Sequence, residues 1–168
     1  MNKVLKNEWS IYFKNKKNYL KCRLLKEHEY YIWKYICFLR KEENSRILPI
    51  KYFWRRKKNI IGAKLGITIY ENVFEEGLHI WHYGNIVVNG YAKVGKGCIL
   101  HGDNCIGNNG KDDYAPVIGN SVDIGVGAKI IGNIKIANNI KVAAGAVVIN
   151  SFEEEGITIG GIPARKLR

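Results

Sequence analysis

The stretch VIGNSVDIGVGAKIIGNIKIANNIKVAAGAVVINSF, residues 117–152, decides the fold of this chain. Aliphatic residues recur in it at a strict spacing of six, and a small or aliphatic residue lies four places after each of the first five. The recurring residues are Ile118, Ile124, Ile130, Ile136, Val142 and Val148. A helix would repeat about every 3.6 residues and a strand about every two. One short strand and one corner per six residues, with three such units to a coil, fits this spacing and predicts a β-helix.

The same repeat extends towards the N-terminus. Its earlier members are Ile106, Leu100, Val94 and Val88, and one further step back reaches His82. An imidazole where the repeat requires an aliphatic side chain breaks the local pattern, and such breaks concentrate at functional sites. Gly119, Gly125 and Gly132 fall at or near the expected corners, where glycine adopts a positive φ at little cost.

Residues 108–116 interrupt the repeat. The segment is polar and carries Gly110 and Pro116, so we expect a loop that leaves the coil and can wall a cleft. Two coils before this loop and two after it give about four to five coils. The β-helix domain is therefore expected over residues 59–168.

The first third of the chain has a different composition. Residues 1–58 hold 17 Lys and Arg against 5 Asp and Glu, so the whole net charge of +12 lies there, with 12 of the 19 aromatic residues. Apolar residues recur at three and four over residues 3–14 and 18–43, which predicts two helices. Ser45 can cap a third helix that has Pro49 in its first turn. The change near residue 59 marks the one expected domain boundary.

Basic residues among aromatic ones suit several partners. They can bind an anionic membrane surface, an anionic glycan or a lipid-linked substrate, or they can form a helical cap that packs on the β-helix and on neighbouring subunits. Nucleic acid is disfavoured, because no known motif is present and the charges are scattered along the helices.

The four cysteines show neither CxxC pairing nor metal-ligand spacing, so we expect reduced thiols and no metal site. Cys98 falls on the small-residue position of the repeat. No signal-peptide pattern follows Met1, and no apolar run is long enough to span a bilayer. A cytoplasmic protein is expected, with peripheral contact to an anionic membrane through residues 1–58 left open.

His82 is the best candidate for a general base among the four histidines, because neutral imidazole accepts a hydroxyl proton near neutral pH. Asn85, His101 and Asp103 are supporting candidates, and His101 should face outward from the coil. His28 lies in a Lys- and Glu-rich segment and is expected on the surface.

Several segments together resemble the serine acetyltransferase branch of the hexapeptide-repeat acyltransferases, over residues 66–168. They are GLHIWHYGNIVV (77–88), AKVG (92–95), GVGAKIIGNI (125–134) and GIPAR (161–165). The resemblance is nearest to short members with a basic helical N-terminal segment that are associated with acetylating sugars of surface polysaccharides. It implies a left-handed β-helix, a homotrimer with active sites at the subunit clefts, and acetyl-CoA as donor.

The resemblance also implies roles for residues. His82 takes the proton of an acceptor hydroxyl, which attacks the thioester directly without an acyl-enzyme. The pantetheine arm lies along the backbone of Gly127, Ala128, Ala144 and Ala146. Arg165 and Lys166 meet the CoA phosphates, unless they are only a solvated tail.

Departures from the family pattern concern the acceptor. Thr68 stands where the family has an aspartate that supports the catalytic histidine, and Ala115 stands where it has a histidine before the proline. The long helical domain of the family is replaced by a basic segment of about 58 residues. We therefore expect a sugar hydroxyl as acceptor, on a surface polysaccharide or its precursor. One of Glu71, Glu75 or Glu76 is then expected to orient His82.

Two other functions stay open. One is a serine O-acetyltransferase of cysteine biosynthesis, and the other is a non-catalytic β-helix binding module recruited to membranes. A γ-class carbonic anhydrase is disfavoured, because it needs three zinc-binding histidines that this spacing does not provide.

Overall fold

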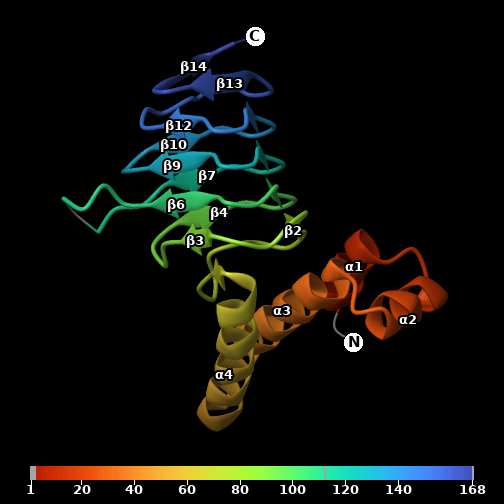
Figure 1. Ribbon diagram of the computed structural model, residues 1–168. Coiled ribbons are helices and arrows are strands. Elements are labelled where there is room, and N and C mark those ends of the chain that lie inside the picture. The colour runs from red at the N-terminus through yellow and green to blue at the C-terminus, as the bar shows by residue number, and fades with distance from the viewer. Residues whose placement is uncertain (1–2, 112, 168) are drawn as a thin grey trace.

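The computed structural model describes residues 3–111 and 113–167, and it consists of four helices followed by a left-handed parallel β-helix (Figure 1). The predicted fold class is confirmed. The helices are α1 Lys3–Tyr12, α2 Lys16–Leu24, α3 His28–Glu43 and α4 Leu48–Leu65. Among the described residues, none of these helices is apolar and long enough to cross a membrane.

Within residues 3–111 and 113–167, fourteen short strands form the three faces of the coil. They are β1 Ile67–Thr68, β2 His79–Ile80, β3 Ile86–Val88, β4 Lys93–Val94, β5 Ile99–Leu100, β6 Cys105–Gly107, β7 Val117–Ile118, β8 Asp123–Ile124, β9 Lys129–Ile131, β10 Lys135–Ile136, β11 Lys141–Val142, β12 Val147–Val148, β13 Thr158–Gly161 and β14 Ala164–Lys166. Sheet A has the order β1-β3-β6-β9-β12, sheet B has β10-β7-β4, and sheet C has β14-β13-β11-β8-β5-β2.

The repeat of six places one aliphatic residue per strand inside the prism. All six residues that defined it are at most 3% exposed, and the slim position Cys98 is fully buried. Strands one coil apart pair in parallel, as Val142 does with Ile124 and Val148 with Ile130. The core is therefore a set of stacked aliphatic side chains, and the residues between them face outward.

The glycines at 119 and 125 have a different role from the one expected. Gly132 has a positive φ as predicted, and so does Gly127, whereas Gly119 and Gly125 do not. A Cβ on Gly125 would lie 2.6 Å from the backbone nitrogen of Ala144, and one on Gly119 would lie 2.5 Å from Oδ1 of Asn138. These two glycines are required because the next coil passes too close for a side chain.

The segment between β6 and β7 leaves the coil and projects from one side of the prism (Figure 1). Its last residues, Ala115 and Pro116, are buried again where the chain returns to β7.

The helical segment also differs from its prediction in three places. Residues 18–43 form two helices, because the chain turns between α2 and α3, where Lys26 has a φ of 57°. Ile47, not Ser45, is the N-cap residue of α4, and the Ser45 hydroxyl donates to the carbonyl of Lys41 at 2.6 Å. The change of composition at residue 59 falls inside α4, which continues to its left-handed cap at Gly66.

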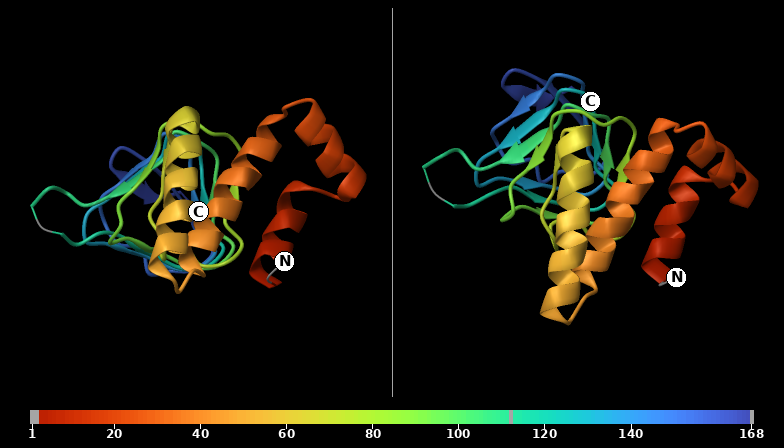
Figure 2. Two further views of the ribbon diagram at one scale, coloured as in Figure 1. Left: turned by 90° about the horizontal axis from the view of Figure 1, so that it is seen from below. Right: turned by 60° about the horizontal axis from the view of Figure 1, so that its bottom comes forward.

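Helices α3 and α4 lie over the first coil, as the view from the helical end shows (Figure 2). Two tyrosine hydroxyls bind the backbone of that coil. Tyr12 accepts from the nitrogen of Ile80 at 2.9 Å, and Tyr35 accepts from the nitrogen of Ile69 at 3.0 Å. Burial raises the pKa of both tyrosines, so the hydroxyls stay protonated.

A buried ion pair completes this contact. Arg40 and Glu8 are bonded at 2.7 Å with side-chain exposures of 4% and 0%. Arg40 also donates to the carbonyls of Phe74 and Glu75 at 2.7 and 2.6 Å, and Glu8 accepts from the nitrogen of Gly77 at 3.2 Å. The helices thus supply the hydrogen bonds that a preceding coil would have supplied, and they act as the cap that the aromatic composition suggested.

Candidate active site

The corners that join sheet C to sheet A stack in one column, which we call the corner column: residues 81–85, 101–104, 125–128 and 143–146. Backbone nitrogens bind the corner below. Asp103 donates to the carbonyl of Gly84 at 3.0 Å, and Gly127 donates to the carbonyl of Gly102 at 3.0 Å. The column gathers predicted site residues that are far apart in sequence: His82, Asn85, His101, Asp103, Gly127, Ala128, Ala144 and Ala146.

His82 lies at the foot of the column, on the surface, in the corner between β2 and β3. The repeat had predicted an inward position for His82, but the residue does not occupy one. Ile80 does, since it pairs with Leu100. The corner holds two extra residues and turns through Gly84 and Asn85, which have φ of 109° and 49°. The longer corner shifts the register and leaves the imidazole of His82 outside the prism.

Gly102 lies against His82 and allows the two corners to approach closely. A Cβ on Gly102 would lie 3.4 Å from the Cβ of His82 and 3.2 Å from its carbonyl oxygen. A side chain at this position would press on the backbone of His82. Gly102 has a φ of 114°, which other residues rarely adopt.

His28 contacts His82, which the sequence did not predict. The ring centroids are 5.6 Å apart, with the planes inclined by 31°. His28 is the first residue of α3, and its Nδ1 lies 3.5 Å from Oε2 of Glu29. No local pattern could reveal this pair, because it depends on how the helical segment packs against the coil.

A second pair lies one coil above. Nε2 of His101 and Oδ1 of Asp123 are 2.8 Å apart, and both side chains are partly exposed. The ring of Trp81 stacks on His101 at 6.2 Å and lies 4.6 Å from His79. His101 faces outward as predicted, but Asp123 was missed. The pairing of Leu100 with Ile124 could have found it, since it makes His101 and Asp123 neighbours.

His79 occupies the half-buried side of this cluster. Burial, and then the charge of His101, lower its pKa below the ordinary value. The ring of Tyr12 from α1 packs edge-on against it at 5.5 Å. The uncharged form of His79 is therefore favoured next to the candidate site.

The three glutamates expected to orient His82 precede β2, whereas His82 follows it. The Glu71 carboxylate binds Lys51 at 2.9 Å and Arg55 at 2.7 Å. Burial raises its pKa, but hydrogen bonds from these cations outweigh burial and lower the pKa to about 2. Glu76 pairs with Lys96 at 3.1 Å, and Glu75 is exposed. The carboxylates of Glu71 and Glu76 are therefore engaged by other partners.

Further up the column, the side chains of Ala128 and Ala146 point into the core, so only their backbone can meet a ligand. Gly127 and Ala144 are at the surface. Asp103 is paired with Lys129 at 3.3 Å. The upper corners therefore offer backbone groups at Gly127 and Ala144, beside the exposed side chain of Val126.

The last hairpin ends beside the top of the column. Arg165 on β14 pairs with Gly160 on β13, and a Cβ on Gly160 would lie 2.8 Å from the Cβ of Ala143. Arg165 is exposed, whereas Lys166 is bonded to Glu154 at 2.6 Å. Arg165 is thus the freer of the two predicted cations.

Comparisons of sequence find serine acetyltransferases, although no protein-family model matches the chain. It is 34% identical over 106 residues to the serine acetyltransferase of Synechococcus elongatus, which covers 62% of this chain and 39% of that protein. It is 30% identical over 131 residues to that of Buchnera aphidicola, which covers 70% and 49%. The chain spans about half or less of the length of these curated relatives.

Solved structures give the same result. A serine acetyltransferase from Brucella abortus superimposes with a TM-score of 0.77 at 25% identity, over 98% of this chain and 67% of that one. Soybean serine acetyltransferase, solved with serine, gives 0.76 at 25% identity, over 98% and 68%. These matches include the helices, so the helical segment resembles part of the helical domain that the sequence suggested it had replaced.

Together, the coil, the corner column and these likenesses define a hexapeptide-repeat chain. Within that class it is serine acetyltransferase-like.

Proposed function

We propose that this chain is an acetyl-CoA-dependent O-acetyltransferase with His82 as general base. The observation that carries the proposal is the exposed imidazole of His82 at the foot of the corner column. A Brucella abortus serine acetyltransferase has been solved with coenzyme A, at 24% identity and a TM-score of 0.75 over 98% of this chain and 66% of that one. That complex supports acetyl-CoA as the donor.

In the proposed mechanism, His82 accepts the proton of the acceptor hydroxyl while its oxygen bonds to the thioester carbonyl carbon. Backbone N–H groups stabilise the oxyanion. When the C–S bond breaks, the thiolate of CoA takes the proton from the imidazolium. The acetyl group ends on the acceptor oxygen and the proton on the CoA sulfur, and no covalent enzyme intermediate is required.

In this proposal, His28 orients the imidazole of His82. The contact at 5.6 Å restricts the rotation of an otherwise exposed ring, and Glu29 holds His28 in turn. The helical segment would then serve the site as well as the fold. This assignment replaces the expectation that Glu71, Glu75 or Glu76 orients the base.

Donor binding is assigned to the upper column. The backbone at Gly127 and Ala144, with that of Ala128 and Ala146, would accompany the pantetheine arm. Arg165 would meet a CoA phosphate, since guanidinium binds phosphate through paired hydrogen bonds. Lys166 would contribute less, because Glu154 already neutralises it.

Free serine is the acceptor that the comparisons favour, since the relatives are serine acetyltransferases. This support goes to the alternative function of the sequence analysis and not to its main one. A sugar hydroxyl remains the second candidate, on one observation: Thr68 and Ala115 stand at the two acceptor-side positions where the family pattern has an aspartate and a histidine.

Thiol release from acetyl-CoA tests these proposals. Wild type and His82→Ala would be compared with free serine, nucleotide sugars and oligosaccharides as acceptors. Release that requires serine supports the first acceptor, and release that requires a saccharide supports the second. If His82→Ala released thiol as fast as wild type, His82 would not be the general base. No release with any acceptor, together with salt-sensitive binding to anionic vesicles, would favour a non-catalytic module.

We also propose a homotrimer, in which the corner column of one subunit faces the next. Sedimentation equilibrium tests it, because a mass other than three chains would contradict it. Contact of residues 3–58 with anionic membranes stays a proposal that rests on the 17 basic residues within residues 1–58.

A further inference from the structure

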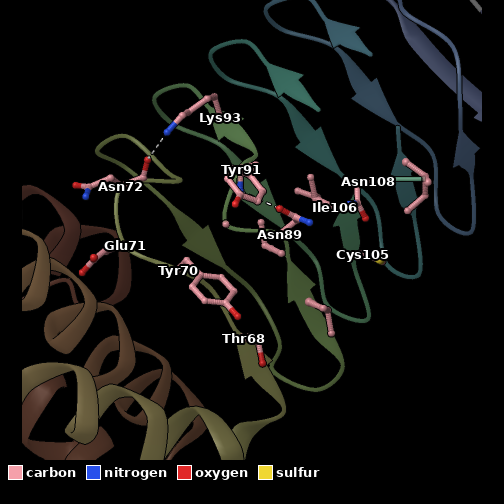
Figure 3. A pocket seen from close by; sticks show the side chains of 15 residues that line it. Thr68, Tyr70, Glu71, Asn72, Asn89, Tyr91, Lys93, Cys105, Ile106 and Asn108 are labelled. Carbon is pink, nitrogen blue, oxygen red and sulfur yellow. Dashed lines mark hydrogen bonds between the residues drawn. The ribbon is translucent and has the colours of Figure 1, made fainter. Parts of the chain in front are cut away.

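A cavity of about 880 Å³ opens on the outer face of sheet A, beyond the groups assigned above. Figure 3 shows the side chains that line it. Its floor follows the outward residues of three paired strands, Thr68, Val87 and Cys105. Its upper end reaches Asn108, where the projecting loop leaves the coil. We call this cavity the sheet A groove.

Two tyrosines stand beside the groove with much of their surface in solvent. Tyr70 is 56% exposed and Tyr91 is 65% exposed. The ring of Tyr70 packs closely on Gly90, since a Cβ on Gly90 would lie 3.3 Å from Cγ of Tyr70. Large aromatic side chains left exposed around a cavity mark a binding site more often than a stabilising feature.

The polar groups of the groove are mostly amides. Asn89 accepts from the nitrogen of Tyr91 at 2.8 Å, which leaves its own amide N–H groups to donate (Figure 3). Asn72 and Asn108 also line the groove. An amide side chain both donates and accepts hydrogen bonds, as a hydroxyl-rich ligand requires.

Charge limits the ligand further. The ionisable carboxylate and ammonium groups of the lining are Glu71 and Lys93. Glu71 is engaged by Lys51 and Arg55, and Lys93 donates to the carbonyl of Asn72 at 3.4 Å. One lysine does not suit a polyanion. The volume suits a ligand much larger than an amino acid, because pockets of about 300–1,000 Å³ hold drug-sized molecules.

We propose that the sheet A groove binds a neutral or N-acetylated oligosaccharide, with sugar rings packed on Tyr70 and Tyr91 and sugar hydroxyls bonded to the asparagines. His82 lies in the corner that precedes β3, and Val87 of β3 lines the groove. If the bound saccharide is the acetyl acceptor, the groove gives the acceptor class. That part alone rests on the proposed function.

Isothermal titration calorimetry tests the groove independently of catalysis. Chitotetraose and cellotetraose would be titrated into wild type, Tyr70→Ala, Tyr91→Ala and His82→Ala, with tetragalacturonate and free serine as comparison ligands. We expect at least one neutral tetrasaccharide to bind wild type with submillimolar affinity, and each tyrosine variant to lose at least tenfold. His82→Ala should bind like wild type.

Tyr52→Ala is the matched control, because Tyr52 is 58% exposed but lies on α4 away from the groove. Gly90→Val gives a second way to fill the groove without removing an aromatic ring. Absence of binding by both neutral saccharides would overturn the proposal, as would binding that survives Tyr70→Ala and Tyr91→Ala together. A change of mass in the tyrosine variants, without saccharide binding to wild type, would assign the groove to contact between copies and also overturn it.

Discussion

The early and late coils are built on one six-residue repeat, but only the late coils follow it without extra residues. From Ile118 to Val148 the inward residues fall every six positions, whereas eight positions separate Ile80 from Val88. The extra residues make the corner that presents His82, and the extra residues after β6 make the projecting loop. The strict coils supply a stiff scaffold, and the departures from the repeat supply exposed chemical groups.

The largest expected effect is at the irregular corner. His82→Ala should lower kcat by about a thousandfold, because a positioned general base contributes about 10²–10⁴-fold. The KM for acetyl-CoA should change little. Steady-state kinetics with the acceptor that supports thiol release in wild type measure both, and Tyr83→Ala, in the same corner, is the control. A His82 variant with wild-type kcat would mean that the corner is irregular for another reason.

Next is the junction between the helices and the first coil. Arg40→Leu should destabilise the chain by about 3–5 kcal/mol, because it leaves Glu8 buried and unpaired. Urea unfolding measures the loss, and Arg56→Leu, at an exposed position of α4, should change stability by less than about 0.5 kcal/mol. If Arg40→Leu unfolded like wild type, the helices would be an appendage and not part of the same cooperative unit.

At the regular end of the molecule, Arg165→Gln should raise the KM for acetyl-CoA by about tenfold, the equivalent of about 1.4 kcal/mol for one exposed charge-assisted contact. Lys166→Gln should have a smaller effect, because Glu154 already binds it. Acetyl-pantetheine, which lacks the nucleotide, provides the comparison. An equal loss with both donors would show that Arg165 acts on the fold and not on phosphate.

A smaller change is expected from the contact between helix and corner. His28→Ala should lower kcat by about three- to tenfold and leave the melting temperature unchanged, whereas His28→Phe should keep most activity because the ring contact remains. Equal activity of all three proteins would leave His82 without this support.

The smallest effect concerns pH and stability. The pKa of His79 is lowered in the folded protein, so the unfolded chain binds more protons below about pH 6.5, and stability should fall as the pH drops from 7 towards 5. His79→Phe should flatten this acid limb. Urea midpoints at pH 7, 6 and 5 test it, and a limb unchanged by the substitution would assign it to other groups.

The sequence predicted what depends on local spacing. The inward aliphatic positions, the slim residues and the outward direction of His101 all follow from one period of six. It failed where a corner changed length, since the extra residues after Trp81 shifted the register and moved His82 out of the frame. It also missed His28 and Asp123, because their contacts join segments that only tertiary packing brings together.

Both open ends of the coil are closed by different means. At one end Tyr12, Tyr35 and Arg40 occupy the backbone groups of the first turn, and at the other β14 runs antiparallel along β13. A parallel coil with a bare rim would offer a template on which further chains could add indefinitely, as amyloid does. The closed ends therefore prevent further chains from adding along the prism axis. Copies can still associate side by side.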